Sequence, residues 1–226
     1  MRQVQFTPGQ YYHDFNHGTE ERKVFQSDND YKRFLISLVV FNDTKASLHN
    51  LGRFVHNPRF LLESYNSDQR NHLVEIIAFT LLPTHFHLFL KEKEKGGISL
   101  FMHRLSKGYS RYFNLKYERN GTLWQGPFKA KLIDEEPYFV HIISYIHLNI
   151  LDLYPLNWRE GNLDDWKMAE SKMRKYSWSS YAYHRTGKSD VSFMDLVLQK
   201  QDWFLDYFPL PEDFEKNLQL WSMRAK

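Results

Sequence analysis

The chain has 226 residues, 42% hydrophobic and 25% charged, a composition typical of one globular domain or one domain with an extension. It contains no cysteine, which excludes disulfides and thiolate metal sites and is consistent with a reducing cytoplasm. The net charge of +3 neither requires nor excludes a nucleic-acid partner, and no apolar run reaches the ~20 residues that span a bilayer. We therefore expect a soluble cytoplasmic protein that has no membrane partner.

The first half of the sequence alternates between strand and helix patterns. Residues 10–17 are predicted to form a strand that ends at Gly18, and residues 27–41 a helix capped by Ser27 or Asp28. Residues 49–70 are polar and irregular, and we expect no regular element there. Residues 73–82 and 85–93 are two strand patterns around Pro83 and Thr84, which predicts a hairpin.

The second half is richer in helix patterns. A long helix is predicted over 98–121, a short strand over 128–134 and a second long helix over 135–151. Residues 155–175 look like a polar connection, and 176–187 like an irregular aromatic segment whose rings we expect mainly in the core. The last residues, 188–226, look helical and amphipathic. The order predicts an α+β fold, a mostly antiparallel sheet flanked by helices.

The stretch PTHFHLFL, residues 83–90, places two histidines in a strand that otherwise looks buried. Residues i and i+2 of a strand share one face, so His85 and His87 point the same way and can bind one metal ion. A lone His-x-His is more often a pair of hydrogen-bonded or exposed strand histidines, so a metal site here needs a further ligand. The hydrolase pattern that continues His-x-His into Asp-His is absent, and a cupin would need more strands.

The second long predicted helix contains ISYIHLN, in which Tyr145 and Asn149 are four residues apart and share a face. Asn149 offers a carbonyl oxygen to a hard cation, and Tyr145 offers a phenol that a metal-polarised phosphate makes a competent nucleophile. The alternative is that Tyr145 packs in the core and Asn149 caps the helix. Tyr138 is a rival nucleophile without a ligand at i+4, and His147 points away from this face.

These residues give the chain a resemblance to the HUH tyrosine transposases, most closely the REP-associated tyrosine transposases. The family is marked by His-hydrophobic-His on a strand and one nucleophilic tyrosine on a later helix, as in THFHLFL and YIHLN here. Three flanking segments also resemble it: YYHDFNHGTEERKVFQSDNDYKRFL, LWQGPFKAKLI and YSWSSYAYH. The resemblance covers roughly residues 10–187. One departure is Ile150, where the family usually has proline after the asparagine.

The resemblance implies a ferredoxin-like or RRM-like HUH core, with a catalytic domain over 1–187 and a helical extension over 188–226. It implies that His85, His87 and Asn149 bind Mg²⁺ or Mn²⁺ and that Tyr145 is the nucleophile. The substrate would be single-stranded or hairpin DNA, cleaved and rejoined through a 5′-phosphotyrosine intermediate by a monomer or homodimer. Neither ATP nor an organic cofactor is needed, and the sequence has no Walker-type glycine-rich loop.

Basic residues offer candidate DNA contacts in two places. Arg104, Lys107 and Arg111 recur at i, i+3 and i+7 on the helix predicted over 98–121, and Lys129 and Lys131 share one face of the short strand. Such cations position phosphates without specifying sequence, although each set also fits a solvated surface.

Three other kinds of protein remain open from the sequence. A domesticated DNA-binding protein of the same fold would not need His85, His87, Tyr145 and Asn149 together. An unrelated metal hydrolase would use the two histidines and give Tyr145 no role. A plasmid-type replication initiator shares the chemistry and differs in the flanking segments.

Overall fold

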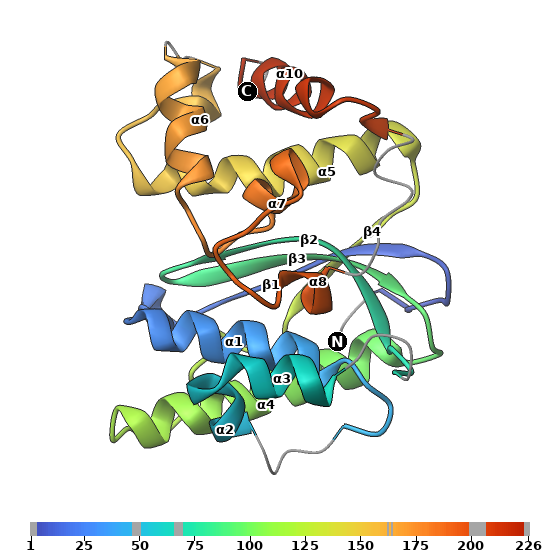
Figure 1. The fold of residues 1–226 in the computed structure, drawn as a ribbon, viewed down its shortest axis with the longest axis vertical. Coiled ribbons are helices and arrows are strands. Elements are labelled where there is room, and N and C mark those ends of the chain that lie inside the picture. Colours follow the sequence, from blue (N-terminus) through green and yellow to red (C-terminus); the bar gives the residue numbers. More distant parts are fainter. Residues whose placement is uncertain are drawn as a thin grey trace.

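Four antiparallel strands form the central sheet in the order β2-β3-β1-β4 (Figure 1). The strands are β1 (Tyr11–His17), β2 (Val74–Leu82), β3 (His85–Glu92) and β4 (Lys129–Ile133). β2 and β3 pair from Val74 opposite Glu92 to Leu82 opposite His85, which confirms the predicted hairpin. The computed structural model describes residues 4–46, 51–65, 70–161, 163, 165–198 and 207–223. The strand that carries the histidine pair therefore lies inside the sheet, between β2 and β1.

One face of the sheet is covered by α1 (Asp28–Phe41) and α4 (Gly97–Lys116), with α2 (Leu51–His56) and α3 (Pro58–Ser64) beside them (Figure 1). Alternate residues of β3, such as Phe86 and Leu88, are buried in this layer. The two long helices approach closely at Gly108, where an added Cβ would lie 2.6 Å from the Phe41 ring. A side chain at this position would push α4 away from α1.

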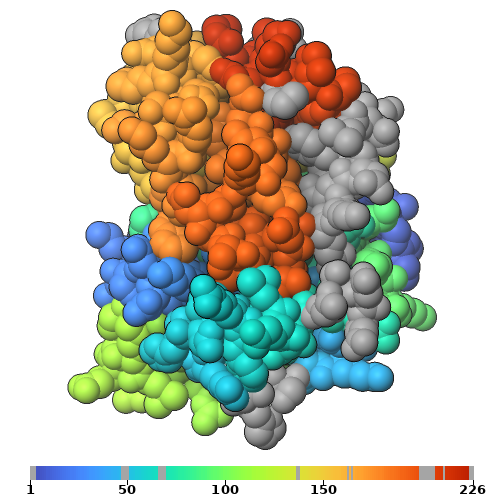
Figure 2. All heavy atoms as spheres, in the orientation of Figure 1, coloured from blue at the N-terminus to red at the C-terminus, as the bar shows by residue number. Residues whose placement is uncertain are grey.

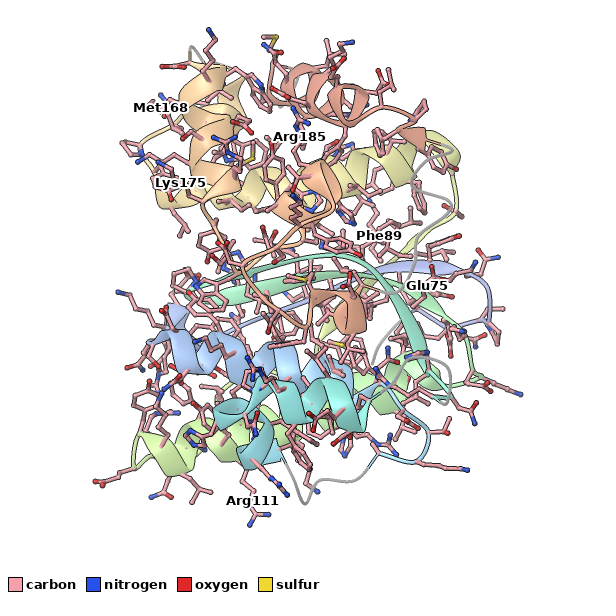
Figure 3. The ribbon with its side chains drawn as sticks, viewed as in Figure 1. Glu75, Phe89, Arg111, Met168, Lys175 and Arg185 are labelled. Atoms are coloured by element: carbon pink, nitrogen blue, oxygen red, sulfur yellow. The ribbon has the colours of Figure 1, made fainter. Side chains whose placement is uncertain are left out.

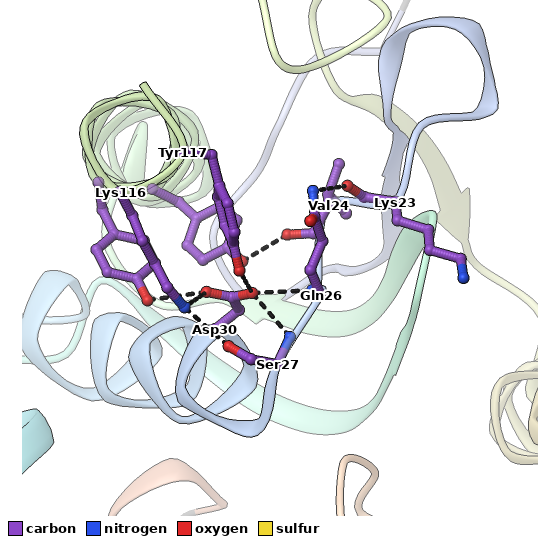
Figure 4. Close-up of polar contacts among 9 residues, drawn as sticks. Lys23, Val24, Gln26, Ser27, Asp30, Lys116 and Tyr117 are labelled. Carbon is purple, nitrogen blue, oxygen red and sulfur yellow. Dashed lines mark hydrogen bonds and ion pairs between the residues drawn. The ribbon is translucent and has the colours of Figure 1, made fainter. Parts of the chain in front are cut away.

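A buried carboxylate also joins α1 to α4. One oxygen of Asp30 accepts hydrogen bonds from the N–H groups of Gln26 and Ser27, at 2.8 and 2.9 Å, which satisfies donors at the start of α1. The carboxylate also accepts from three side chains at the end of α4 and just after it (Figure 4). These are Tyr112 at 2.9 Å, Lys116 at 2.6 Å and Tyr117 at 2.7 Å.

The opposite face of the sheet is covered by α5 (Glu136–Leu148), which continues into the 3₁₀ turn η3 (Asn149–Leu153). Outside α5 lie α6 (Trp166–Arg174) and α10 (Pro211–Ser222), as Figure 1 shows. Helix α7 (Tyr181–Thr186) contacts α5 through Tyr181, whose ring centroid lies 5.8 Å from that of His147. Phe89 points from β3 into this layer (Figure 3), where it packs with Ile142, Ile143 and Ile146 of α5. Two short 3₁₀ turns, η1 (Thr19–Glu21) and η4 (Trp158–Glu160), lie in the connections between these elements.

The segment after α6 links the two layers across the outer edge of β2, and Figure 2 shows it in orange on the viewed face. The N–H of Leu81 donates to the Trp178 carbonyl at 2.9 Å, and the N–H of Ser180 donates to the Phe79 carbonyl at 3.0 Å. These bonds satisfy part of an edge strand that would otherwise be open to pairing. The ring of Tyr181 is fully buried, which agrees with the expected core role of this aromatic segment.

Three segments that were expected to be irregular contain helices. Residues 49–70 contain α2 and α3, residues 155–175 contain η4 and α6, and residues 176–187 contain α7. Each is short and carries few apolar residues, so a helical period is hard to detect in it. Side-chain caps supply part of their stability: Asn57 accepts the N–H of Phe60 before α3, and Asp165 accepts the N–H of Met168 before α6. The second long helix also ends at Leu148, three residues earlier than predicted.

The C-terminal residues form helices, as predicted, in the part of the tail that the structure describes. These helices are α8 (Met194–Val197) and α10, while residues 199–206 and 224–226 lie outside the described residues. Val197 is buried in the layer of α1 and α4, and Phe214 in the layer of α5. The tail therefore contributes to both cores, and the division at residues 187 and 188 stays a prediction. Within the described residues, no helix is both long and apolar enough to cross a membrane.

Candidate functional site

Histidines from two neighbouring strands gather on the face of the sheet that α5 covers. His85 and His87 share this face with Phe89, whose ring contacts α5 through Phe139 at 4.9 Å. Antiparallel pairing places His17 of β1 directly opposite His85. Because His13 and His17 alternate with the buried residues of β1 that face α1 and α4, both lie on the same face as the β3 pair.

Each histidine of the β3 pair has a neighbour at its Nδ1 atom. His87 Nδ1 lies 2.9 Å from Nε2 of His13, and His85 Nδ1 lies 2.9 Å from the Thr84 hydroxyl. The His85 ring also stacks on His17 with 4.4 Å between ring centroids. Among the described residues, the Nε2 atoms of His85 and His87 have no hydrogen-bond partner. Metal-binding histidines commonly have this arrangement, in which a partner at one nitrogen fixes the ring and leaves the other for the ion.

Burial keeps these imidazoles neutral. It lowers the pKa of His87 well below the usual value, and the neighbouring histidines and Arg159 lower it further. Burial and the His17 charge lower the pKa of His85 to about 4. Burial, with Lys131, lowers the pKa of His13 to about 3. A histidine must be neutral to donate a lone pair to a metal. At neutral pH, neither histidine of the pair has to release a proton before it binds the ion.

Tyr145 of α5 lies against these histidines. Its ring centroid is 5.7 Å from that of His87 and 6.0 Å from that of His13, both edge to face. The side chain is half-buried, so part of it remains open to solvent. Tyr138, the rival, instead contacts His141 and lies 2.5 Å from the Lys131 amine. Of the two tyrosines, the structure brings Tyr145 to the histidine pair, and no described ring contact joins Tyr138 to it.

Asn149 follows α5 immediately and occupies its C-cap. Its side-chain amide donates to the Tyr145 carbonyl at 2.5 Å, which matches the capping alternative considered from the sequence. Its side-chain oxygen accepts a hydrogen bond of 2.7 Å from Arg159. The chain continues through Ile150 into η3, so this position accommodates a residue other than proline without breaking the turn. Asn149 is therefore close to the nucleophile candidate, but its oxygen already has a partner.

The donor set suits a small divalent cation. Two neutral imidazoles with available Nε2 atoms and one amide oxygen make a mixed N/O site. The charges of Asp152 and Arg159 both act on the pKa of His85, which places the end of η3 near the histidine pair. Within the described residues, no group of three or more His, Cys, Asp or Glu side chains is arranged to hold a metal. A metal bound here would thus need the amide of Asn149 or oxygens from outside the chain.

A scan of known families matches this region. The model described as "Transposase IS200 like" matches residues 56–149, a stretch that includes His85, His87, Tyr145 and Asn149. Residues 56–149 are therefore similar to the IS200-like transposases. The match leaves out β1 and therefore His13 and His17. Among curated proteins, none matches the chain.

Two solved structures align with most of this chain, and the first of them supports its fold. A REP-associated tyrosine transposase bound to a REP hairpin aligns with a TM-score of 0.51 at 15% identity, covering 84% of this chain and 88% of that chain. The tRNA(His) guanylyltransferase of Saccharomyces cerevisiae aligns at 0.37 and 10% identity, covering 88% of this chain and 82% of that chain. The first comparison confirms the predicted α+β architecture, with a four-stranded antiparallel sheet, flanking helices and C-terminal helices.

The predicted DNA-contacting residues fall on opposite sides of the sheet. Lys131 pairs with His13 across β1 and β4, so the two exposed lysines of β4 lie on the histidine face. Burial lowers the pKa values of His13 and His17, and the lysine charges lower them further: Lys131 acts on His13 and Lys129 on His17.

Helix α4 carries the other set and lies across the sheet from the histidines. Arg104 donates to the carbonyl of Asp43 at 2.7 Å, so it holds a loop in place. Lys107 is exposed, and Arg111 extends away from the sheet (Figure 3). DNA binding by these three residues stays a prediction, and only the β4 lysines lie beside the candidate site.

Several residues of the site were missed from the sequence. His13 and His17 show a detectable signal, because both fall on one face of the strand predicted over 10–17. Thr84 is the residue before the pair and was interpreted only as part of a turn. Arg159 gave no signal, since it lies in a segment interpreted as a polar connection. His147, as expected, points away and lies 2.8 Å from the hydroxyl of Ser180, which is bonded to the edge of β2.

Proposed function

We propose that this protein cleaves single-stranded DNA next to hairpin-forming repeats and transfers the strand through a 5′-phosphotyrosine intermediate on Tyr145. The observation that carries this proposal is the edge-to-face packing of Tyr145 on His87 and His13. A pure DNA-binding protein has no need to bring a tyrosine from α5 against a histidine pair on β3. Tyr145 and His87 lie within the stretch that matches the IS200-like transposases, whereas His13 lies outside it.

The proposed reaction exchanges one phosphodiester for another. The phenol oxygen of Tyr145 forms a bond to the scissile phosphorus, and the bond from phosphorus to the 3′ oxygen breaks. The phenol proton passes to solvent and the 3′ oxygen takes up a proton, so the products are a 5′-phosphotyrosine and a free 3′-hydroxyl. A second 3′-hydroxyl reverses the step and joins a new strand. The phosphate ester is kept throughout, so no nucleotide hydrolysis is required.

The chain supplies binding and orientation for this step. His85, His87 and Asn149 would hold Mg²⁺ or Mn²⁺, which when bound neutralises the charge that develops on the phosphate. His13 and Thr84, at the Nδ1 atoms of the pair, orient the two rings. Lys129 and Lys131 bind flanking phosphates on the same face. The proposed catalytic unit is residues 1–187, with 188–226 as an extension that supports it.

The test uses one hairpin-bearing strand, taken from repeats that flank the protein's own gene, labelled at either end. With Mn²⁺, we expect the 3′-labelled strand to move to the mass of the protein on a denaturing gel. The 5′-labelled strand should give a shorter free product. Chelation of the metal with EDTA should abolish both, because the phosphate then lacks its neutralising charge.

Two controls separate the alternatives. The fully paired duplex of the same sequence should not react, and His87→Ala should bind the hairpin without cleaving it. Two free DNA products with no protein-linked strand would contradict the proposal and indicate hydrolysis by water. Tight hairpin binding without cleavage by wild-type protein would instead indicate a DNA-binding protein that has lost strand transfer.

A further inference from the structure

Arg159, at the centre of η4, forms a bidentate ion pair beside the site. Its Nη2 and Nε atoms donate to the two oxygens of Asp152 at 2.5 and 3.0 Å. Nη2 also donates to the side-chain oxygen of Asn149 at 2.7 Å. The guanidinium therefore bridges two side chains of η3, although its own side chain is 48% exposed to solvent.

The same guanidinium lies next to the candidate nucleophile. Its central carbon is 5.7 Å from the centre of the Tyr145 ring. Burial tends to lower the pKa of Arg159, but hydrogen bonding and charge from Asp152 and Tyr145 outweigh this and raise its pKa above the usual value. A cation held at this position is within reach of any phosphate that Tyr145 attacks.

The bond from Arg159 to Asn149 conflicts with the proposed role of that asparagine. The oxygen that accepts from Arg159 is the only ligand atom that the Asn149 side chain can offer, because its NH₂ group is a hydrogen-bond donor without an available lone pair. That NH₂ group donates to the Tyr145 carbonyl. Turning the amide over would place its N–H groups against the guanidinium. A divalent cation at the same oxygen would stand within a few ångströms of a positive charge, which is strongly unfavourable.

We infer that Arg159 is a latch that holds the Asn149 oxygen until a substrate phosphate draws the guanidinium away. This inference rests on the proposed function. Guanidinium groups pair with phosphate in a bidentate manner, as Arg159 now does with the Asp152 carboxylate. When the guanidinium turns to the phosphate, the Asn149 oxygen becomes available as a ligand. DNA binding and metal binding then strengthen each other by the same factor.

The test measures Mn²⁺ binding directly, from the electron paramagnetic resonance signal of the free ion. All proteins carry Tyr145→Phe, so that no strand is cleaved, and are titrated with and without the single-stranded hairpin. For the parent, which carries Tyr145→Phe alone, we expect the hairpin to tighten Mn²⁺ binding by about tenfold, within the usual range of coupling between sites. Adding Arg159→Ala should tighten Mn²⁺ binding without DNA by a similar factor and remove the effect of the hairpin.

Arg159→Lys and Arg185→Ala are the matched comparisons. Lysine keeps the charge but lacks the planar fork that pairs with Asp152 at two points, so we expect an intermediate affinity without DNA. Arg185 forms a comparable ion pair with Glu215 at 2.6 Å, in the outer layer, and its removal should leave Mn²⁺ binding unchanged. Thermal unfolding of each variant identifies any general loss of structure.

If Arg159→Ala binds Mn²⁺ no more tightly than the parent without DNA, Arg159 only supports the fold and the latch is wrong. That result would leave strand transfer by wild-type protein untouched. Wild-type protein could instead form no DNA adduct while Arg159→Ala still binds Mn²⁺ more tightly. The proposed function would then be wrong, but the competition between Arg159 and the metal ion for the Asn149 oxygen would be supported. If the parent binds Mn²⁺ too weakly to measure, measurable binding by Arg159→Ala supports the latch and its absence overturns it.

Discussion

Replacing Tyr145 with phenylalanine is expected to abolish the protein-linked DNA product, with a loss of roughly 10⁴-fold or more in rate. Phenylalanine keeps the edge-to-face contacts with His87 and His13 and removes only the oxygen that attacks phosphorus. The fold and the binding of the hairpin should therefore be preserved. The measurement is the gel described above, with the 3′-labelled strand and Mn²⁺, together with hairpin affinity determined on the same preparation.

Tyr138→Phe is the matched control for this prediction. Tyr138 lies seven residues earlier on the same helix, and its hydroxyl contacts Lys131 instead of the histidine pair. We expect this variant to keep at least a large part of the cleavage activity. A product lost in Tyr138→Phe and retained in Tyr145→Phe would show that the nucleophile is Tyr138, near the start of α5. It would leave the class of reaction intact but would contradict the site described here.

The largest expected effect on stability comes from Asp30. Its carboxylate is fully buried and accepts five hydrogen bonds, two from the backbone before α1 and three from side chains at the end of α4. Asp30→Ala would leave these donors without their acceptor, and breaking a buried charged pair typically costs about 3–5 kcal/mol. We expect the lower end of this range, because Lys116 is 30% exposed and can turn to solvent. Chemical denaturation at neutral pH measures the loss.

The effect of Asp30 should also depend on pH. Burial raises the pKa of this carboxyl group, but hydrogen bonds from Lys116 and Tyr117 outweigh burial, so its pKa in the folded protein is below the usual value. A lowered pKa contributes stability above the unfolded-state value of about 3.9 and loses it as pH falls through the folded-state pKa. The difference between wild type and Asp30→Ala should therefore shrink below about pH 4.

Asp28→Ala is the matched control, because Asp28 lies in the same first turn of α1 and is exposed. It should cost only the helix-dipole contribution of a surface carboxylate, about 0.5 kcal/mol. Equal losses for Asp28→Ala and Asp30→Ala would show that the buried network adds nothing beyond the dipole. A loss for Asp30→Ala that stays constant down to pH 3 would contradict the lowered pKa.

The parts of the site that lie on regular strands and helices could be predicted from the sequence. The two-residue period of a strand is enough to place His85 and His87 on one face of that strand. The helical period likewise places Tyr145 and Asn149 on one face of the predicted helix. The same rule also puts His13 and His17 on one face of β1. That β1 lies next to β3, and so brings these histidines to the pair, depends on the strand order. The order β2-β3-β1-β4 is a long-range property that local patterns do not contain.

The state of Asn149 could not be predicted for a related reason. Helical spacing shows that its side chain lies near Tyr145, but its partner comes from η4, ten residues later, in a segment without a clear period. The short helices α2, α3 and α6 were missed because each buries only a few apolar residues, such as Leu61 in α3 and Ala169 in α6. Tertiary packing, more than intrinsic propensity, stabilises elements of this length.

The most direct test of the whole account is to identify the residue that carries DNA after reaction. Wild-type protein is incubated with the hairpin strand and Mn²⁺, digested with nuclease and protease, and its peptides are analysed by mass spectrometry. The account predicts a 5′-nucleotide joined through phosphate to Tyr145, within the peptide that spans α5. A nucleotide on any other residue, or cleaved DNA with no modified peptide, would contradict it.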